Sequence, residues 1–187
     1  NYPVALQGKT IAGYAVAIEN VATGRQTLNT ELLTTLTETA AGMTNGTQTT
    51  DVLLTGLGDV AFKTTYEKWV GEHASASENL SAWYIPTLSQ LSAFMGTLFT
   101  MKDVPATGSE DFKNIPEFEF VNGKMFDRET IATVNYASST INNQGNVSGV
   151  RINVADGVVT NAQEAGISVK TALNQQALCR PMITIFK

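Results

Sequence analysis

Apolar positions recur with helical spacing in a first segment near the middle of the chain. Four of them fall at i, i+4, i+7 and i+8 on one helix face: Phe62, Tyr66, Trp69 and Val70. Asp59 stands just before this stripe, and Asp often accepts hydrogen bonds from the first backbone N–H groups of a helix. The pattern predicts an amphipathic helix over residues 60–72 with Asp59 as its N-cap.

A second apolar stripe follows Pro86 and has a clearer start signal. Thr87 and Gln90 have the spacing of a capping box, in which each side chain accepts a hydrogen bond from the other residue's backbone N–H. The apolar residues after it share a broad helix face: Leu88, Leu91, Phe94, Met95, Leu98 and Phe99. Because a proline pushes the preceding residue toward extended backbone, we expect a strand-like Ile85 and a helix that begins at Thr87.

The N-terminal segment, residues 1–28, alternates as a strand does. Its larger apolar residues stand among small ones: Ile11, Tyr14, Val16 and Ile18. We expect one strand near residues 13–20. The segment that follows is Thr- and Gly-rich, and it predicts a short helix over residues 30–41 and then a polar loop over residues 44–51. Thr is only a modest helix former, so its abundance does not favour a longer helix.

The last third of the chain has residue patterns typical of strands and turns. Asn-Gly at 122–123 and Asp-Gly at 156–157 suit the positive φ angles of tight hairpin turns. Alternating residues flank the second dipeptide, so residues 150–159 are predicted to form a two-stranded hairpin. Residues 178–186 are apolar on both faces, which is typical of a central strand, and Pro181 indicates a bulge or the strand start.

The order of these elements indicates an α+β fold, with one strand, two or three helices and then several antiparallel strands. The chain has 187 residues, 43% of them hydrophobic, and that length is sufficient to bury one core. We therefore expect a single domain over residues 1–187. No apolar stretch reaches the roughly 20 residues that span a bilayer, so we expect no direct membrane insertion.

Charge is scarce, at 16% of residues with a formal net charge of -5. Without a basic run, counterion release cannot drive binding to phosphates, which excludes nucleic acid as a partner. One Cys and one His cannot build a disulfide framework or a tetrahedral zinc site within the chain, and we expect no cofactor or metal. Cys179 is interpreted as a small core residue and His73 as a helix-end or surface residue.

Three short motifs, in order along the chain, resemble one family. They are Trp-Tyr-Ile-Pro-Thr-Leu-Ser-Gln-Leu, Tyr-Ala-Ser-Ser-Thr and a closing Arg-Pro strand. Their matching positions are Trp83, Tyr84, Pro86, Thr87 and Gln90 in the first, Tyr136, Ser138 and Ser139 in the second, and Arg180 and Pro181 in the third. The motifs are similar to those of the Fibrobacter succinogenes major paralogous domain and the related domain of unknown function 1566. They bracket residues 59–187.

The resemblance implies a C-type-lectin-like fold, with two or three helices packed on short, mainly antiparallel sheets. It also implies a setting on bacterial surface proteins, notably in Bacteroidetes, including pilus-associated ones. The chain departs from the family at Ala137, where an aromatic residue is expected, and in the longer, amide-rich segment 156–178. Such folds present loops at both places, so the departures imply a diverged ligand surface.

The motif residues also have plain structural interpretations. Trp83 and Tyr84 are expected in the core, and the hydroxyls of residues 138–140 are expected to satisfy backbone groups where a strand ends. Arg180 lies on a mostly apolar strand and needs a partner. Four carboxylates are candidates for it: Glu117, Glu119, Asp127 and Glu129. We interpret Arg180 as half of a structural ion pair.

The chemistries best known on lectin-like folds lack their residues in this sequence. Calcium-dependent sugar binding uses a Glu-Pro-Asn or Gln-Pro-Asp loop with a Trp-Asn-Asp strand, and the chain has neither. Formylglycine-generating enzymes rely on more than one cysteine, and a Ser-His-Asp site would lack its Gly-x-Ser-x-Gly elbow. We therefore expect a calcium-independent protein that is not an enzyme.

Uncharged amide side chains gather on both sides of the predicted 150–159 hairpin. Such groups donate and accept hydrogen bonds together, which suits sugar hydroxyls or a peptide backbone, although Asn and Gln are also ordinary loop residues. The candidate ligand-binding residues are Asn142, Asn143, Asn146, Asn161, Gln163, Asn174 and Gln175.

These observations lead to two functional hypotheses. The first is a non-catalytic, adhesin-like module, extracellular or on the bacterial cell surface, that binds a glycan or a surface protein. The second is a structural subunit or decorating head domain of a pilus, surface layer or virion, with neighbouring subunits as partners, or a receptor-binding protein of the diversity-generating-retroelement type. Export would depend on a segment outside this sequence, because the N-terminus lacks the basic and apolar regions of a signal peptide.

Overall fold

The computed structural model describes residues 6–22, 26–27, 46–57, 60–74, 77–100, 133–142, 144–153, 167–170, 173 and 176–187. Within them the helices are Gly46–Leu57 (α2), Ala61–Glu72 (α3) and Leu88–Thr100 (α4). The strands are Ile11–Val16 (β1), Gln26–Thr27 (β2), Thr133–Ile141 (β3), Val147–Asn153 (β4), Ile167–Lys170 (β5), Gln176–Ala177 (β6) and Met182–Phe186 (β7).

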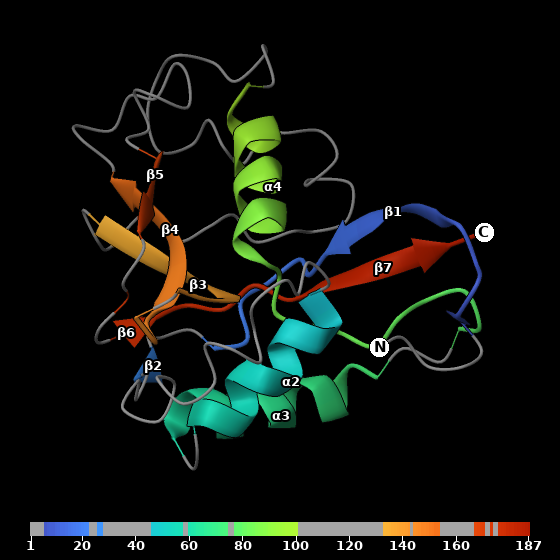
Figure 1. Cartoon of the computed structure of the whole chain (residues 1–187), viewed down its shortest axis with the longest axis horizontal. Coiled ribbons are helices and arrows are strands. Elements are labelled where there is room, and N and C mark those ends of the chain that lie inside the picture. Colours follow the sequence, from blue (N-terminus) through green and yellow to red (C-terminus); the bar gives the residue numbers. More distant parts are fainter. Residues whose placement is uncertain are drawn as a thin grey trace.

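The arrangement is that of an α+β fold, as the sequence predicts. The described strands form three antiparallel sheets, β1–β7, β2–β6 and β3–β4–β5. In Figure 1, α4 stands between the β3–β4–β5 sheet and the β1–β7 pair, and α2 and α3 lie together below them. Helix α2 contacts β3, and α4 contacts both β3 and β4.

Strand β7 has backbone neighbours on both edges. It pairs with β1 on one side. On the other side the N–H of Tyr84 donates to the carbonyl oxygen of Met182 at 2.8 Å, and the N–H of Met182 donates back to Tyr84 at 2.9 Å. The central strand predicted near the C-terminus is therefore confirmed, and it begins directly after Pro181, which has no N–H to give to a ladder.

Strand β1 begins and ends earlier than the predicted strand over residues 13–20. The chain bends at residues 18–19, which ends the regular strand. It nevertheless stays beside the segment that leads into β7. The N–H of Ala17 donates to Pro181 at 2.8 Å, and the N–H of Val21 donates to Cys179 at 3.0 Å.

The hairpin predicted over residues 150–159 is wrong. Strand β4 pairs with β3 on one edge and β5 on the other, and Ile152 stands opposite Ile167 instead of a residue just across the Asp-Gly dipeptide. Register depends on which face of the whole strand is buried, and a turn dipeptide does not carry that information. Both dipeptides, at 122–123 and 156–157, lie outside the described residues.

Helices α3 and α4 confirm the two predicted amphipathic helices, but the cap of α3 differs. Val60 is the N-cap, with extended backbone at φ -118° and ψ 157° and no side-chain capping bond. The assignment of Asp59 as N-cap is therefore wrong. Burial of Phe62 and Tyr66 on one face is enough to place this helix.

The polar loop predicted over residues 44–51 is also wrong, because α2 begins at Gly46. Leu53 and Leu57 on this helix are fully buried, and burial of an apolar face outweighs the low helix propensity of its threonines. The hydroxyl of Thr50 donates to the Gly46 carbonyl at 2.7 Å, so it is satisfied inside the helix. The helix predicted over residues 30–41 lies outside the described residues.

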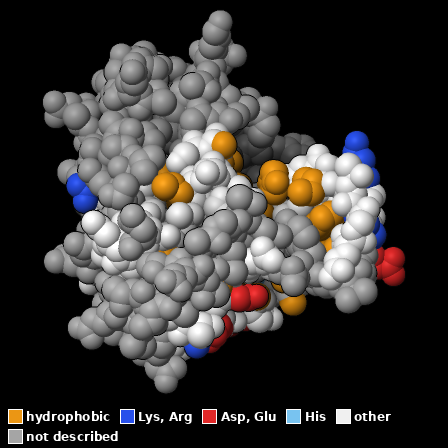
Figure 2. Space-filling model, viewed as in Figure 1, with side chains coloured by type: hydrophobic (Ala, Val, Ile, Leu, Met, Phe, Trp, Pro, Cys, Tyr) orange, Lys and Arg blue, Asp and Glu red, His pale blue; other side chains and the backbone are white. Residues whose placement is uncertain are grey.

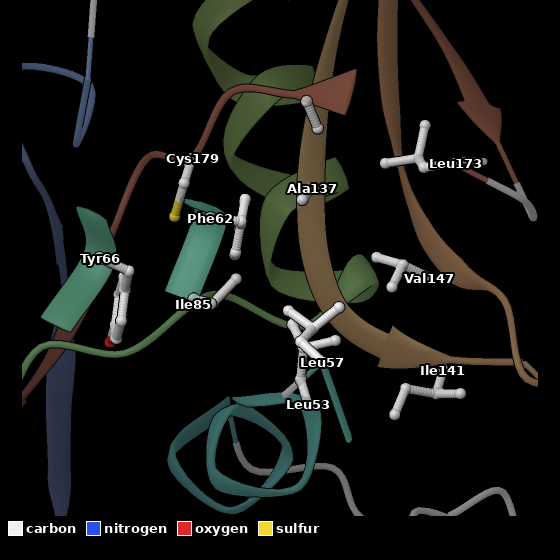
Figure 3. Close-up of a cluster of buried hydrophobic side chains, with 11 residues drawn as sticks. Leu53, Leu57, Phe62, Tyr66, Ile85, Ala137, Ile141, Val147, Leu173 and Cys179 are labelled. Carbon is white, nitrogen blue, oxygen red and sulfur yellow. The ribbon is translucent and has the colours of Figure 1, made fainter. Parts of the chain in front are cut away.

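A cluster of buried hydrophobic side chains joins the helices to the sheets. It consists of Leu53, Leu57, Phe62, Tyr66, Ile85, Ala137, Ile141, Val147, Leu173, Ala177 and Cys179. Figure 3 shows the leucines of α2 meeting Ile85, with the side chains of β3 and β4 on one side and those of Tyr66 and Cys179 on the other. The extended segment that contains Ile85 therefore packs against α2, α3 and β3.

Candidate functional site

The first two sequence motifs meet at Ser139 of β3. Its hydroxyl donates to the carbonyl oxygen of Ile85 at 2.8 Å, and its backbone N–H donates to the carbonyl oxygen of Pro86, also at 2.8 Å. The hydroxyl of Thr49 on α2 lies 2.6 Å from that of Ser139. All four residues are buried, where unpaired polar groups are costly, so these bonds fix the segment before α4 to β3.

The start of α4 shows the predicted capping box. The N–H of Thr87 donates to Oε1 of Gln90 at 3.0 Å, and the N–H of Gln90 donates to Oγ1 of Thr87 at 3.2 Å. A second cap comes from β3, because the N–H of Leu88 donates to Oγ1 of Thr140 at 2.9 Å. These side chains accept hydrogen bonds from the first backbone N–H groups of α4, which have no partner within the helix. The bond to Thr140 also attaches the start of α4 to β3.

The two aromatic residues of the first motif have different places. Tyr84 is buried as expected, and its hydroxyl lies 3.1 Å from both Thr184 Oγ1 and Gln90 Nε2. Trp83 is only half-buried, so its expected place in the core is wrong. Its indole N–H donates to the carbonyl oxygen of His73 at 2.7 Å, which ties the end of α3 to the segment before α4.

The second motif also builds the fold, at an irregularity of β3. The pairing register of β3 and β4 shifts between Ala137 and Ile141, and the Ser138 hydroxyl there donates to the carbonyl oxygen of Ser148 at 2.7 Å. Tyr136 is fully buried and bridges Leu178. Ala137 is buried in the core cluster, so its expected place at a loop surface is wrong.

Arg180 is buried at 1% exposure just before β7. Its Nε donates to Oδ1 of Asn20 at 2.8 Å, and its Nη1 donates to the carbonyl oxygen of Ala17 at 3.1 Å. The guanidinium thus ties the end of β1 to the start of β7 through neutral oxygens. The carboxylates proposed as its partners, at 117, 119, 127 and 129, lie outside the described residues.

Cys179 and His73 are not exposed together. Burial raises the pKa of the Cys179 thiol far above its usual range, although the neighbouring Arg180 acts in the opposite direction. The thiol is therefore protonated at neutral pH and is a poor nucleophile. His73 is exposed at the C-terminal cap of α3, with its ring stacked on Trp69 at a centroid distance of 4.2 Å.

The predicted amide site is described only in part. Asn142 and Asn146 lie in the turn between β3 and β4, and Oδ1 of Asn142 accepts hydrogen bonds from the N–H groups of Gln144 at 2.9 Å and of Asn146 at 3.0 Å. This side-chain oxygen therefore shapes the turn. The other candidates lie outside the described residues: Asn143, Asn161, Gln163, Asn174 and Gln175.

The structure shows a groove that the sequence did not reveal, between α4 and the β1–β7 pair. Its volume is about 490 Å³. It is lined by Tyr14 and Val16 of β1, Met182 of β7, and Ser89, Gln90, Ala93 and Phe94 of α4. Figure 2 shows hydrophobic side chains over β1 beside α4, at the mouth of this hollow.

The part of the groove lining that the structure describes is uncharged and mostly apolar. Tyr14 is 50% exposed, and the hydroxyl-bearing Tyr14 and Ser89 are its polar members together with Gln90. Because the side-chain amide of Gln90 already serves the capping box and Tyr84, it is held in one orientation. The groove therefore offers a preformed apolar surface with a few polar groups, which is the usual composition of a ligand site.

Two other kinds of feature are absent from the described part of the chain. Its His, Cys, Asp and Glu side chains form no group of three or more that could hold a metal ion. Its helices include none that is long and apolar enough to cross a membrane. Comparison of the whole chain with protein-family models, with curated proteins and with solved structures found no match.

Proposed function

We propose that the chain is a non-catalytic, adhesin-like binding module of the bacterial cell surface or extracellular space that takes a protein ligand without calcium. The observation that carries the proposal is the apolar groove between α4 and the β1–β7 pair. Its volume of about 490 Å³ lies within the usual range of ligand sites. An uncharged, mostly apolar surface suits the apolar side chains of a protein better than the hydroxyls of a sugar.

Two sequence features support this proposal. The chain lacks the loop and strand motifs of calcium-dependent lectins. Its three motifs resemble those of the Fibrobacter succinogenes major paralogous domain, a C-type-lectin-like family of bacterial surface proteins.

The buried, protonated Cys179 supports the non-catalytic part, because it removes the chain's one thiol as a nucleophile at neutral pH. Glycan binding at the amide residues stays a prediction.

A structural subunit of a filament or surface layer is the second candidate. It is favoured by β1, which has the uncharged sequence Ile-Ala-Gly-Tyr-Ala-Val and leaves Ile11 and Tyr14 exposed. Exposed apolar strands are suited to contact with another chain. Under this alternative the groove and β1 would bind a neighbouring subunit.

The proposal is tested by screening the purified chain on an array of cell-surface and matrix proteins and on a glycan array, with and without EDTA. We expect a protein ligand that is retained in EDTA.

Ala93→Arg places a charge in the groove and should weaken binding by about tenfold or more. Ala61→Arg makes the same change on the exposed face of α3 and should bind as the parent does. Calcium-dependent binding, binding to glycans alone, or binding that Ala93→Arg leaves intact would contradict the proposal.

A further inference from the structure

The same two residues of β1, Tyr14 and Val16, form its outer edge and line the groove. In an antiparallel pair, alternate residues bond to the partner strand, and the residues between them point their N–H and C=O groups away from it. The N–H of Ala17 donates to Pro181, and Ala15 stands opposite Ile183 in the same alternation. The backbone groups of Tyr14 and Val16 therefore point to the outer edge, and the side chains of these two residues line the groove.

The register of β1 with β7 shifts between Ile11 and Gly13, but over residues 13–16 the outer edge lacks the features that usually prevent strand pairing. Proteins protect edge strands with charged residues, prolines or strong bulges. Residues 13–16 of β1 are uncharged, contain no proline and keep a regular register with β7. Within the described residues β7 has its other edge occupied by the segment before α4, so β1 is the outer strand of this sheet.

We propose that the partner supplies an extended peptide segment, which adds as a strand to the outer edge of β1 and places alternate apolar side chains in the groove. This inference rests on the proposed function and names the form of its ligand. Tyr14 and Val16 present backbone donors and acceptors about 7 Å apart along the edge, the two-residue repeat of a strand. An extended polypeptide matches this repeat and carries side chains at the same spacing, so one ligand satisfies both the edge and the groove.

The chemistry of the groove defines which side chains the peptide must carry. Every lining residue that the structure describes is uncharged, so a buried Lys, Arg, Asp or Glu of the peptide would lose its hydration without gaining an opposite charge from them. The matching segment therefore has Val, Leu, Ile or Phe at two positions separated by one residue. The intervening side chains point away from the groove and are not restricted by it.

Val16→Pro is the decisive variant. Its missing N–H and its ring obstruct the outer edge, whereas the bonds from β1 to β7 come from the neighbouring residues and are kept. Val16→Ile keeps the N–H and is the matched control. Thermal unfolding of both variants shows whether they remain folded.

The test uses a displayed library of random twelve-residue peptides, selected on the purified chain. We expect enriched peptides with apolar residues at alternate positions that bind Val16→Ile as the parent and Val16→Pro at least about tenfold more weakly. N-methylation of single residues in a selected peptide should weaken binding to the unmodified chain at alternate positions only, since one set of N–H groups faces β1. This second measurement does not depend on how any variant folds.

The possible failures are distinguishable. Peptides that lose binding to Ala93→Arg but bind Val16→Pro normally, or that tolerate N-methylation without alternation, would overturn strand addition and leave the groove as the ligand site. Peptides unaffected by Ala93→Arg would overturn the proposed groove site itself. An absence of enriched peptides would overturn strand addition, as would self-association of the chain that Val16→Pro abolishes, because the occupant would then be a second copy.

Discussion

The hydroxyl of Ser139 donates a hydrogen bond of 2.8 Å to the carbonyl oxygen of Ile85, 54 residues earlier in the chain. This bond joins β3 to the segment whose other edge pairs with β7, so it connects the β3–β4–β5 sheet to the sheet that carries the groove. Because both residues are fully buried, water cannot replace the bond if it is lost. Ser139 is therefore a structural residue on which the geometry of the groove depends.

Ser139→Ala is expected to lower the free energy of unfolding by about 1–3 kcal/mol, because it removes bonds to Ile85 and Thr49 in a buried setting. Urea denaturation followed by tryptophan fluorescence measures the change. Ser89→Ala removes an exposed hydroxyl on α4 and should change stability by less than about 0.5 kcal/mol. Equal effects of the two variants would refute the structural role of Ser139.

Gly149 is expected to tolerate no side chain. A Cβ at this position of β4 would collide with the backbone oxygen of Tyr136 and with Cδ1 of Leu173. Gly149→Ala should therefore lower the free energy of unfolding by about 1–3 kcal/mol, the usual cost of overpacking. Gly71→Ala is the control, since a Cβ there meets nothing within 4 Å in α3 and should add up to about 1 kcal/mol through helix propensity. Thermal and urea unfolding measure whether each variant loses or gains stability relative to the parent. A Gly149→Ala variant as stable as the parent would contradict the close packing at this position.

Arg180→Lys is expected to be destabilising even though it keeps the charge. The guanidinium reaches Asn20 and Ala17 from two different nitrogens in one plane, and a single ammonium group cannot reproduce that fork. We expect a loss of about 2–3 kcal/mol in the free energy of unfolding. Arg151→Lys changes a half-buried arginine bonded to Asn135 and should cost under about 1 kcal/mol. If Lys serves equally well at both positions, the fork geometry has no energetic role.

The elements with local signals could be predicted from the sequence. The capping box of Thr87 and Gln90 and the extended segment set by Pro86 depend on residues within a few positions of one another. Helix α2 could not be predicted in this way. Its threonines favour a loop, and it is helical because Leu53 and Leu57 meet Ile85 and β3, which are distant in the chain.

The groove was missed for the same physical reason. Its walls come from β1, α4 and β7, and they face one another only after β7 has paired with β1. One signal was present in the sequence. The buried Ala17 lies on one face of this segment, and Tyr14 and Val16 lie on the other. The solvated face of an outer strand usually carries polar residues, whereas the side chains of these two residues are mainly hydrocarbon.

Cys179 and Tyr66 make stability depend on pH in the alkaline range. Burial is the main cause that raises the pKa of each group, from ordinary values of 9.0 and 10.0 to values far above them. Both groups are neutral when protonated, so the native chain keeps protons that the unfolded chain releases. The stabilisation is fully present below about pH 9 and is lost as the pH rises further, by up to about 1.4 kcal/mol per pH unit for each group.

Urea denaturation at pH 7, 9 and 10 should therefore show a falling free energy of unfolding, and Cys179→Ala should make the decline between pH 9 and 10 shallower. The variant removes the buried proton of Cys179 and leaves that of Tyr66, so part of the decline must remain. Ellman's reagent gives an independent measurement. It should react with Cys179 only as fast as the native chain opens, because the buried thiol is protonated and inaccessible. A native thiol that reacts as fast as in urea, or an equal pH slope in parent and variant, would contradict the burial of Cys179 as the source of this dependence.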